Sequence, residues 1–399
     1  MHRLSFLLLL LCLSVSIAAQ QPTPLPHDAY VQVRGGLNNS HLAITQQHKA
    51  TIAYLGGSIT NNPGWRNKVD SFFRATYPAT QFRFINAGIP SLGSLPHVFR
   101  VQRDLLDSGK IDLLFIEAAV NDRVNGTDSL TQVRDLEGIV RHVRKTNPAL
   151  DIVLMSFADE DKTSDYNQGK VPAEVANHEM VAAHYNLPSI NLAKEVRDRI
   201  GNGEFEWKKD FRDLHPSPFG QQLYFNSIRE LLLRCYNGTS AITKIKKAAI
   251  PAPLDAARFE KGVYYDITYA RHDSGWAINP DWTPTDGLNT RPGFVHRPML
   301  IGKTPGATLT LPFKGTAIGI SIVSGSDAGI IAYSIDGGPF KTVDLFTRWS
   351  KSLHLPWYLL FSGDLKPGKH TLQLKIAEEK NEKSVGHACR IVYFLVNEL

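Results

Sequence analysis

The pattern of hydrophobic and polar positions changes once along the chain, near residue 240. Before that point, short apolar runs alternate with stretches whose apolar residues recur every three or four positions. The runs "TIAYL", "FRFINAG", "IDLLFIEAA", "DIVLMSFA" and "PSINLA" predict buried strands. Between two of them, "SLTQVRDLEGIVRHVRKTNP" places Leu136, Ile139 and Val143 on one helical face. Strands that alternate with helices predict a parallel sheet covered by helices on both faces.

The pattern after residue 240 is that of an all-β domain. A connecting stretch, "TKIKKAAIPAPLDAARFEKG", leads into short strand-like runs such as "TAIGISIVS" and "KHTLQLKIA". Asp336-Gly337-Gly338 reads as a hairpin turn between two of these runs. Many short strands separated by turns predict an antiparallel sandwich of the jelly-roll kind. We therefore expect a signal peptide over 1–20, a catalytic α/β domain over 21–240, a linker over 241–260 and a β-sandwich domain over 261–399.

The first twenty residues have the pattern of a secretory signal peptide. Arg3 precedes an apolar stretch that is short for a membrane span, and Ala18-Ala19 supply small residues for cleavage. Cys12 lacks the small residues that usually precede a lipidated cysteine, which disfavours a lipoprotein. The expected location is therefore outside the cytoplasm, secreted or periplasmic, without insertion into the membrane.

Composition and charge exclude some classes of function. A hydrophobic content of 43% and a charged content of 21% are ordinary for a soluble globular protein, and 399 residues suit two domains. The net charge of +6 is spread along the chain, and no dense basic stripe is interleaved with aromatic residues, so we expect no nucleic-acid partner. A mildly positive field would suit an acidic polysaccharide. Cys235 and Cys389 are expected to be two separate buried thiols, and the alternative is a disulfide formed in an oxidising compartment; two cysteines far apart in the sequence do not make a metal site.

Four polar segments fall next to the ends of the predicted elements of the first domain. Ser58 follows the first strand through Gly56-Gly57, and "NAGIPSLGS" follows the second strand. Asn121 follows the third strand, and His215 in "DLHP" precedes the last helix. The carboxyl ends of parallel strands share one edge of a sheet, where ligands bind. A serine, a Gly/Ser-rich loop, an asparagine and a histidine at this edge are what acyl transfer requires.

These segments, in this order, resemble the SGNH (GDSL-like) hydrolase superfamily, and the resemblance covers roughly residues 48 to 236. It implies a flavodoxin-like α/β/α domain that hydrolyses esters without a metal or another cofactor. It also implies roles: Ser58 in "GGSIT" as nucleophile, His215 in "DLHP" as general base, and Asn121 in "AVND" as an oxyanion donor. Counted from Asn86, the loop donor of the family falls on the backbone N–H of Ser91, and the N–H of Ser58 would be a third donor.

Two positions depart from the family pattern. The family more often has "GDS" where this chain has "GGS". The family's acid lies three residues before the histidine, where this chain has Arg212, whereas Asp213 lies only two residues before it. Asp213 is the expected orienting acid, and the alternative is orientation of His215 by a backbone carbonyl. Asp122 is expected to be structural, and Trp65 either walls the pocket or packs in the core.

"GGSIT" with the downstream "GWR" resembles secreted bacterial carbohydrate esterases, which commonly remove acetyl groups and sometimes carry a jelly-roll domain. The leading hypothesis is therefore an O-acetylesterase whose partner is an acetylated polysaccharide or oligosaccharide. One alternative is an esterase or lipase for longer acyl chains, which the polar, Gly/Pro-rich loops disfavour. Another is a carbohydrate-binding protein with a degenerate hydrolase domain, which the presence of Ser58 and His215 disfavours. Trp276, Trp282, Trp349 and Trp357 either stack on sugar rings or, as we expect for most of them, pack in the sandwich core.

Overall fold

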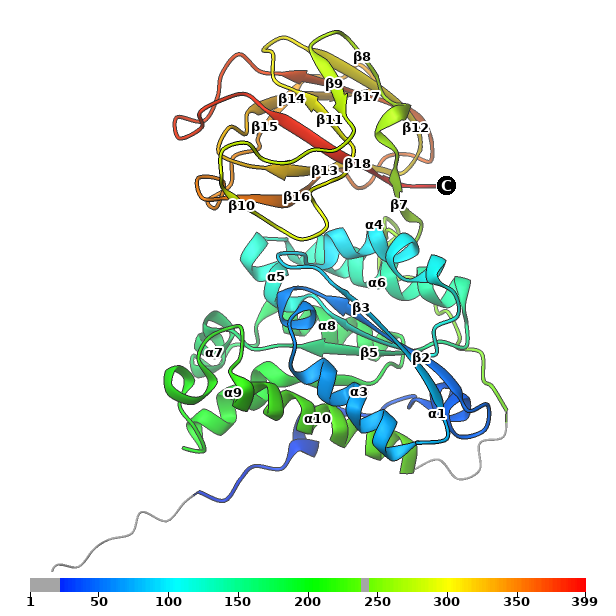
Figure 1. Ribbon diagram of the computed structural model, residues 1–399. Helices are drawn as coiled ribbons and strands as arrows, with labels where there is room; N and C mark the ends of the chain where they lie inside the picture. The colour runs from blue at the N-terminus through cyan, green and yellow to red at the C-terminus, as the bar shows by residue number, and fades with distance from the viewer. Residues whose placement is uncertain (1–21, 238–243) are drawn as a thin grey trace, which may run out of the picture.

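The computed structural model describes residues 22–237 and 244–399, so the expected signal peptide lies outside the described residues. An α/β domain is followed by an all-β domain that sits against one helical layer of the first (Figure 1). The fold class predicted from the hydrophobic pattern is confirmed. In the described ranges, no helix has both the length and the apolar character needed to span a membrane.

The sheet of the α/β domain has the strand order β1-β6-β5-β4-β2-β3. Neighbouring strands are parallel except at one edge, where β1 runs antiparallel to β6. The chain continues from β2 to β3 on one side and then to β4 on the other, which places the switch point of the sheet beside β2. The strands are β1 (Val31–Gln32), β2 (Lys49–Gly56), β3 (Gln81–Gly88), β4 (Leu113–Glu117), β5 (Asp151–Ser156) and β6 (Ser189–Asn191).

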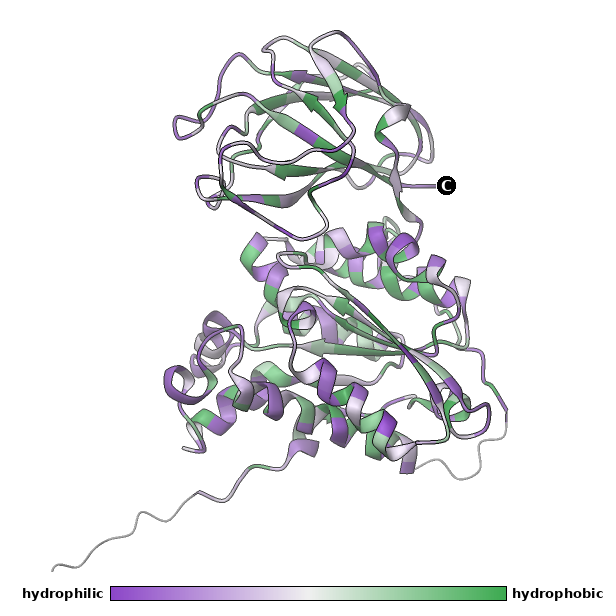
Figure 2. Cartoon of the chain, in the orientation of Figure 1, coloured by the Kyte–Doolittle hydropathy of each residue, from purple (hydrophilic) through white to green (hydrophobic). Residues whose placement is uncertain are grey.

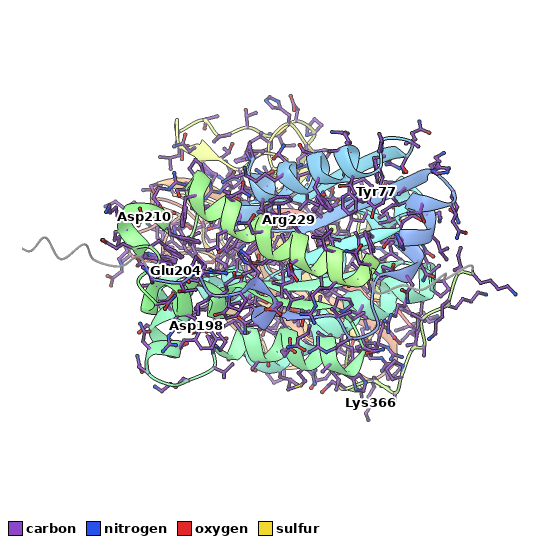
Figure 3. All side chains as sticks on the ribbon, turned by 90° about the horizontal axis from the view of Figure 1, so that it is seen from below. Tyr77, Asp198, Glu204, Asp210, Arg229 and Lys366 are labelled. Atoms are coloured by element: carbon purple, nitrogen blue, oxygen red, sulfur yellow. The ribbon has the colours of Figure 1, made fainter. Side chains whose placement is uncertain are left out.

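Helices cover both faces of this sheet, as the alternating pattern predicts. One face packs on α1, α3, α7, α9 and α10, and the other on α4, α6 and α8, each with its own buried apolar cluster. Figure 2 shows apolar residues gathered on the strands. Figure 3 shows the helical layer that contains α10 from below, with the exposed Arg229 on α10. The helices are α1 (Asn38–Thr45), α2 (Ser58–Asn61), α3 (Trp65–Thr76), α4 (Ser94–Asp104), α5 (Ala119–Asn125), α6 (Ser129–Thr146), α7 (Glu160–Asn167), α8 (Ala173–His184), α9 (Leu192–Gly201) and α10 (Pro218–Asn237), with short 3₁₀ or π turns at His27–Tyr30, Leu106–Ser108, Trp207–Phe211 and Ile267–Tyr269.

In the described part of the chain after residue 243, two sheets face each other across a shared core. Their strands are antiparallel except for the pair β10 and β16. The hairpin predicted at Asp336-Gly337 is confirmed: both residues have positive φ, and β14 and β15 pair across the turn. The first sheet contains β7 (Gly262–Tyr265), β9 (Trp276–Asn279), β10 (Asn289–Thr290), β11 (Met299–Gly302), β13 (Ala317–Ser324), β16 (Leu353–Ser362) and β18 (Cys389–Asn397), and the second contains β8 (Arg271–His272), β12 (Thr308–Gly315), β14 (Ile330–Ile335), β15 (Lys341–Asp344) and β17 (Gly368–Ile376).

The described part of the expected linker, residues 244–260, is fixed along the α/β domain. The guanidinium of Arg141 on α6 donates to the carbonyl of Pro251 at 2.8 Å, and the Glu137 carboxylate accepts from the N–H of Leu254 at 2.6 Å. Phe259 is fully buried in the cluster that α4 and α6 share with the sheet. The same cluster includes Ala317 and Leu395 of the β domain, so it couples the two domains. Cys235 and Cys389 are separate buried thiols, as expected.

Candidate active site

Ser58 lies at the carboxyl end of β2, where the strand passes into the single turn of α2. Its Oγ is 2.8 Å from Nε2 of His215, which reaches it from the segment before α10. The two residues are 157 positions apart in the sequence, so only the fold brings them together. The N–H of Ser58 opens α2, where backbone donors have no partner within the helix. A hydroxyl and an imidazole at this distance can exchange a proton.

Asn121 stands beside Ser58 because β4 ends next to β2. It lies in the first turn of α5, is 8% exposed and lines the same pocket as Ser58. Gly57 makes this approach possible: a Cβ at that position would lie 1.9 Å from Nδ2 of Asn121. The φ of Gly57 is −89°, outside the left-handed region, so φ alone does not require a glycine at this turn. The glycine is required by the nearby amide and not by the turn.

Ser91 completes the group of candidate donors at the pocket. It lies in the loop between β3 and α4, and it lines the pocket together with Ser58 and Asn121. Its φ of +74° is in the left-handed region that favours glycine. The carbonyl of Ser91 accepts a hydrogen bond from Nδ2 of Asn125 at 3.0 Å, which fixes the loop to the end of α5. The loop therefore holds a serine backbone in a conformation that is unfavourable without such support.

Asp213 and Arg212 hold the backbone of His215 from both sides. Asp213 accepts from the N–H of His215 at 2.6 Å, and Arg212 donates to its carbonyl through Nε at 3.1 Å. The Asp213 carboxylate is 3.8 Å from Nδ1 of the ring, beyond hydrogen-bonding distance. Burial lowers the pKa of His215 below its usual range; Asp213 opposes this effect, whereas Arg212 and Arg291 add to it. The imidazole of His215 therefore stays neutral at a lower pH than an ordinary histidine does. In that state it can accept a proton.

A buried carboxyl group braces the loops that carry Ser91 and Asn121. Oδ1 of Asp122 accepts from the N–H of Ser94 at 2.7 Å, at the start of α4. Gly93 leaves room for it, because a Cβ there would lie 2.3 Å from Oδ1. Burial raises the pKa of Asp122 to about 7. The structural role expected for Asp122 agrees with this position behind the pocket.

The pocket lies between the two domains and has a volume of about 280 Å³. The α/β domain supplies the residues around Ser58, and the β domain supplies the opposite wall. Nothing in the sequence near Ser58 points to this wall, because its residues lie more than 200 positions further along the chain. The lining residues are Ser58, Asn62, Pro90, Ser91, Val120, Asn121, Val124, Asn125, Leu214, His215, Arg291, Trp349, Leu353 and Leu355.

The tryptophans that the sequence left open fall into two groups. Trp65 is fully buried and packs edge-to-face on Tyr54, with ring centroids 5.4 Å apart, so it belongs to the core. Trp276 and Trp282 are also buried, as expected for a sandwich. Trp357 is partly buried against the sandwich core, whereas Trp349 lines the pocket next to Ser58.

The described residues offer no site for a metal ion. Among them, no group of three or more His, Cys, Asp or Glu side chains is arranged to hold one.

Comparison with known proteins shows what these residues resemble. Residues 54–223, which contain Ser58, Asn121 and His215, match the sequence model of the GDSL-like Lipase/Acylhydrolase family. No curated protein matched in the corresponding sequence search. The fold is similar to that of a two-domain esterase (CEX) active on acetylated mannans, co-crystallised with mannopentaose: the TM-score is 0.74 at 22% identity, over 94% of this chain and 98% of that chain.

Two further solved structures are similar to this chain to different extents. The esterase (CEX) crystallised without mannopentaose gives a TM-score of 0.73 at 22% identity, over 94% of this chain and 99% of that chain. An acetylxylan esterase from Geobacillus stearothermophilus gives 0.37 at 18% identity, over 46% of this chain and 94% of that chain. Residues 54–223 therefore form a domain similar to the GDSL-like Lipase/Acylhydrolase family, and the match supports a carboxylic ester hydrolase.

Proposed function

We propose that this protein is a secreted serine esterase that removes O-acetyl groups from a polysaccharide or oligosaccharide through an acyl-Ser58 intermediate. The observation that carries the proposal is the distance of 2.8 Å between Oγ of Ser58 and Nε2 of His215, at the pocket edge of the sheet. A serine hydroxyl becomes a nucleophile when a neighbouring base accepts its proton. The neutral imidazole of His215 meets this need.

In the acylation half of the reaction, Oγ of Ser58 attacks the acetyl carbonyl carbon while Nε2 of His215 takes the hydroxyl proton. The carbonyl oxygen becomes an oxyanion, which accepts hydrogen bonds from the N–H of Ser58, the N–H of Ser91 and Nδ2 of Asn121. Each such donor typically stabilises the transition state by about 3 kcal/mol. When the intermediate collapses, His215 returns the proton to the departing sugar oxygen.

In the deacylation half, His215 takes a proton from water, and the resulting hydroxide attacks the carbonyl carbon of acetyl-Ser58. The same donors hold the second oxyanion. Collapse releases acetic acid, and the proton on His215 restores the Ser58 hydroxyl. Asp213 assists as the orienting acid: it holds the His215 backbone, and its charge favours the imidazolium that forms in each half.

The residues that line the pocket support a carbohydrate substrate. Asn62, Ser91, Asn125 and Arg291 give its walls hydrogen-bonding groups, and Trp349 offers an aromatic surface of the kind on which sugar rings stack. The two-domain esterase with a similar fold acts on acetylated mannans, so acetylated mannan is a natural first substrate. The signal-like pattern of residues 1–20 supports export, which sequencing the N-terminus of the exported protein would test.

The experiment is acetate release from acetylated mannan, xylan and pectin by the wild type and by Ser58→Ala. We expect release by the wild type from at least one polymer and none by Ser58→Ala. Equal inertness of both proteins on these polymers and on p-nitrophenyl acetate would refute the proposal. It would favour a carbohydrate-binding protein with a degenerate hydrolase domain instead.

A second candidate is an esterase for longer acyl chains. Val120, Val124, Leu214, Leu353 and Leu355 give the pocket apolar surface that could hold such a chain. A series of p-nitrophenyl esters from acetate to octanoate separates the two candidates. A kcat/KM that falls steeply beyond acetate or propionate supports the acetylesterase, and a preference for octanoate supports the second candidate.

A further inference from the structure

The wall that the β domain contributes to the active-site pocket contains a cation. Of the lining residues, Arg291 is the only one with a permanent charge, and none carries a carboxylate. His215, the other titratable lining residue, is held neutral by its lowered pKa. An ester group and its sugar therefore enter a pocket whose lining carries one guanidinium and no carboxylate, while the charges of Asp213, Arg212 and Arg348 lie just outside the lining.

Arg291 has no partner of its own. Among the described residues, no carboxylate, carbonyl or hydroxyl accepts a hydrogen bond from its guanidinium, and its Nε is buried without an acceptor. Other arginines of this region are engaged: Arg348 donates to the carbonyl of Val124 at 2.9 Å, and Arg390 pairs with Asp327 at 2.6 Å. Arg291 is half-buried, so water still reaches part of its guanidinium, but its buried Nε lacks an acceptor that a bound anion would supply.

The backbone around Arg291 is fixed to the sheet of the β domain. It directly follows β10, whose Asn289 and Thr290 pair in parallel with Leu353 and His354 of β16. The carbonyl of Arg291 accepts a hydrogen bond from the N–H of Phe294 at 3.2 Å. The guanidinium is thus presented beside Leu353 and Leu355 from a defined position, and not from the end of a free loop.

We propose that Arg291 binds the carboxylate of an acidic sugar, so that the preferred substrate is an O-acetylated, uronate-containing glycan. This inference rests on the function proposed above and narrows its substrate class. A guanidinium presents paired N–H donors that match the two oxygens of a carboxylate, which neutral hydroxyl groups cannot match as well. The positive net charge of the chain, +6, acts in the same direction on a polyanion.

The test compares two probes that differ only in charge: an O-acetylated oligogalacturonate and the same oligosaccharide with its carboxylates methyl-esterified. Acetate is measured, so that any release of methanol is not counted. We expect the wild type to show a kcat/KM about tenfold or more higher on the free acid at low salt. We also expect this preference to shrink as sodium chloride is added, because salt screens the attraction.

Variants then assign the preference to Arg291. Arg291→Gln should bring the ratio of kcat/KM for acid over methyl ester close to one, and Arg291→Lys should retain part of it. Arg271→Gln is the matched control, because Arg271 is an exposed arginine of β8 in the other sheet and should keep the wild-type ratio. Thermal midpoints of all variants verify that they fold.

The outcomes separate this inference from the proposed function. A wild type that releases acetate equally well or faster from the methyl ester overturns the inference alone, as does an unchanged ratio in Arg291→Gln. In those cases Arg291 does not select a carboxylate. A wild type that hydrolyses p-nitrophenyl acetate but releases acetate from neither probe nor from acetylated mannan or xylan overturns the carbohydrate proposal, and the inference with it.

Discussion

Asp213 accepts a hydrogen bond from the backbone N–H of His215 at 2.6 Å, but its carboxylate lies 3.8 Å from Nδ1 of the same residue. The acid thus holds the histidine through its main chain and acts on the ring only through its charge. Both side chains are also substantially exposed, 50% for Asp213 and 43% for His215, so solvent weakens that charge interaction. The contribution of Asp213 to the reaction should be modest.

Asp213→Asn tests this directly. The amide oxygen can still accept from the His215 N–H, so only the charge is lost. We expect kcat/KM on p-nitrophenyl acetate to fall about tenfold or less, whereas His215→Ala should lower it by about 10³-fold or more. A loss of about 10⁴-fold in Asp213→Asn would contradict this interpretation, because it is the loss expected of an acid hydrogen-bonded to the ring.

The pH profile follows from the environment of His215. The base works when neutral, so kcat/KM should rise with pH through the His215 pKa and then level off. Burial lowers that pKa, so the midpoint should lie below about 6.5, the ordinary value for histidine. Asp213 raises the pKa, and its loss in Asp213→Asn should move the midpoint to still lower pH. The measurement is kcat/KM from pH 4 to 8 for the wild type and for Asp213→Asn. A midpoint that moves to higher pH in the variant would refute the conclusion that the charge of Asp213 raises the pKa of His215.

Gly57→Ala should disable the Asn121 donor without touching Ser58. The new Cβ would lie 1.9 Å from Nδ2 of Asn121 and 3.3 Å from the carbonyl oxygen of Leu92, so the amide must move. We expect kcat to fall about 10²-fold, as for the loss of one oxyanion donor. Gly201→Ala is the control, because a Cβ there meets nothing within 4 Å and should leave kcat unchanged. Equal kcat values for the two variants would show that Asn121 does not stabilise the transition state.

The left-handed backbone conformation of Ser91 should lower the stability of the protein, which substitutions at this position can test. With φ at +74°, Ser91→Gly should raise the free energy of unfolding by up to about 1 kcal/mol, measured by urea denaturation. Ser91→Ala removes the same hydroxyl but keeps the unfavourable conformation, so it should not stabilise the protein. If the backbone N–H is the oxyanion donor, both variants should retain most of the activity. A loss of more than tenfold in both would show that the hydroxyl takes part.

Phe259 tests how firmly the two domains are joined. It is fully buried, with its ring centroid 5.8 Å from that of Phe99 on α4. Phe259→Ala should lower the free energy of unfolding by about 3–5 kcal/mol, the usual range for a buried phenylalanine. Phe340→Ala is the control, because Phe340 is 55% exposed in the β domain. Similar urea midpoints for the two variants would mean that residues 244–260 act only as a tether.

The sequence by itself determined the architecture of the α/β domain. Buried parallel strands need continuous apolar runs, and the helices between them need one apolar face, so β2 to β6 and the helices that connect them could be predicted. The same order placed Ser58, Ser91 and Asn121 at one edge of the sheet, and it brought His215 to them. The short edge strand β1 was not predicted, because two residues carry no periodic signal and its partner, Ile190, is distant in the sequence.

Only the tertiary structure decided what surrounds Ser58. The requirement for Gly57 comes from the amide of Asn121, and the weak hold of Asp213 on the His215 ring comes from the local path of the chain. The wall with Arg291 and Trp349 depends on how the β domain packs against the helices of the first domain. Hydrophobic periodicity records which face of an element is buried, but it does not record which distant surface covers that face. The sequence therefore identified the candidate nucleophile and base, whereas the packing of the two domains determined the shape and charge of the pocket.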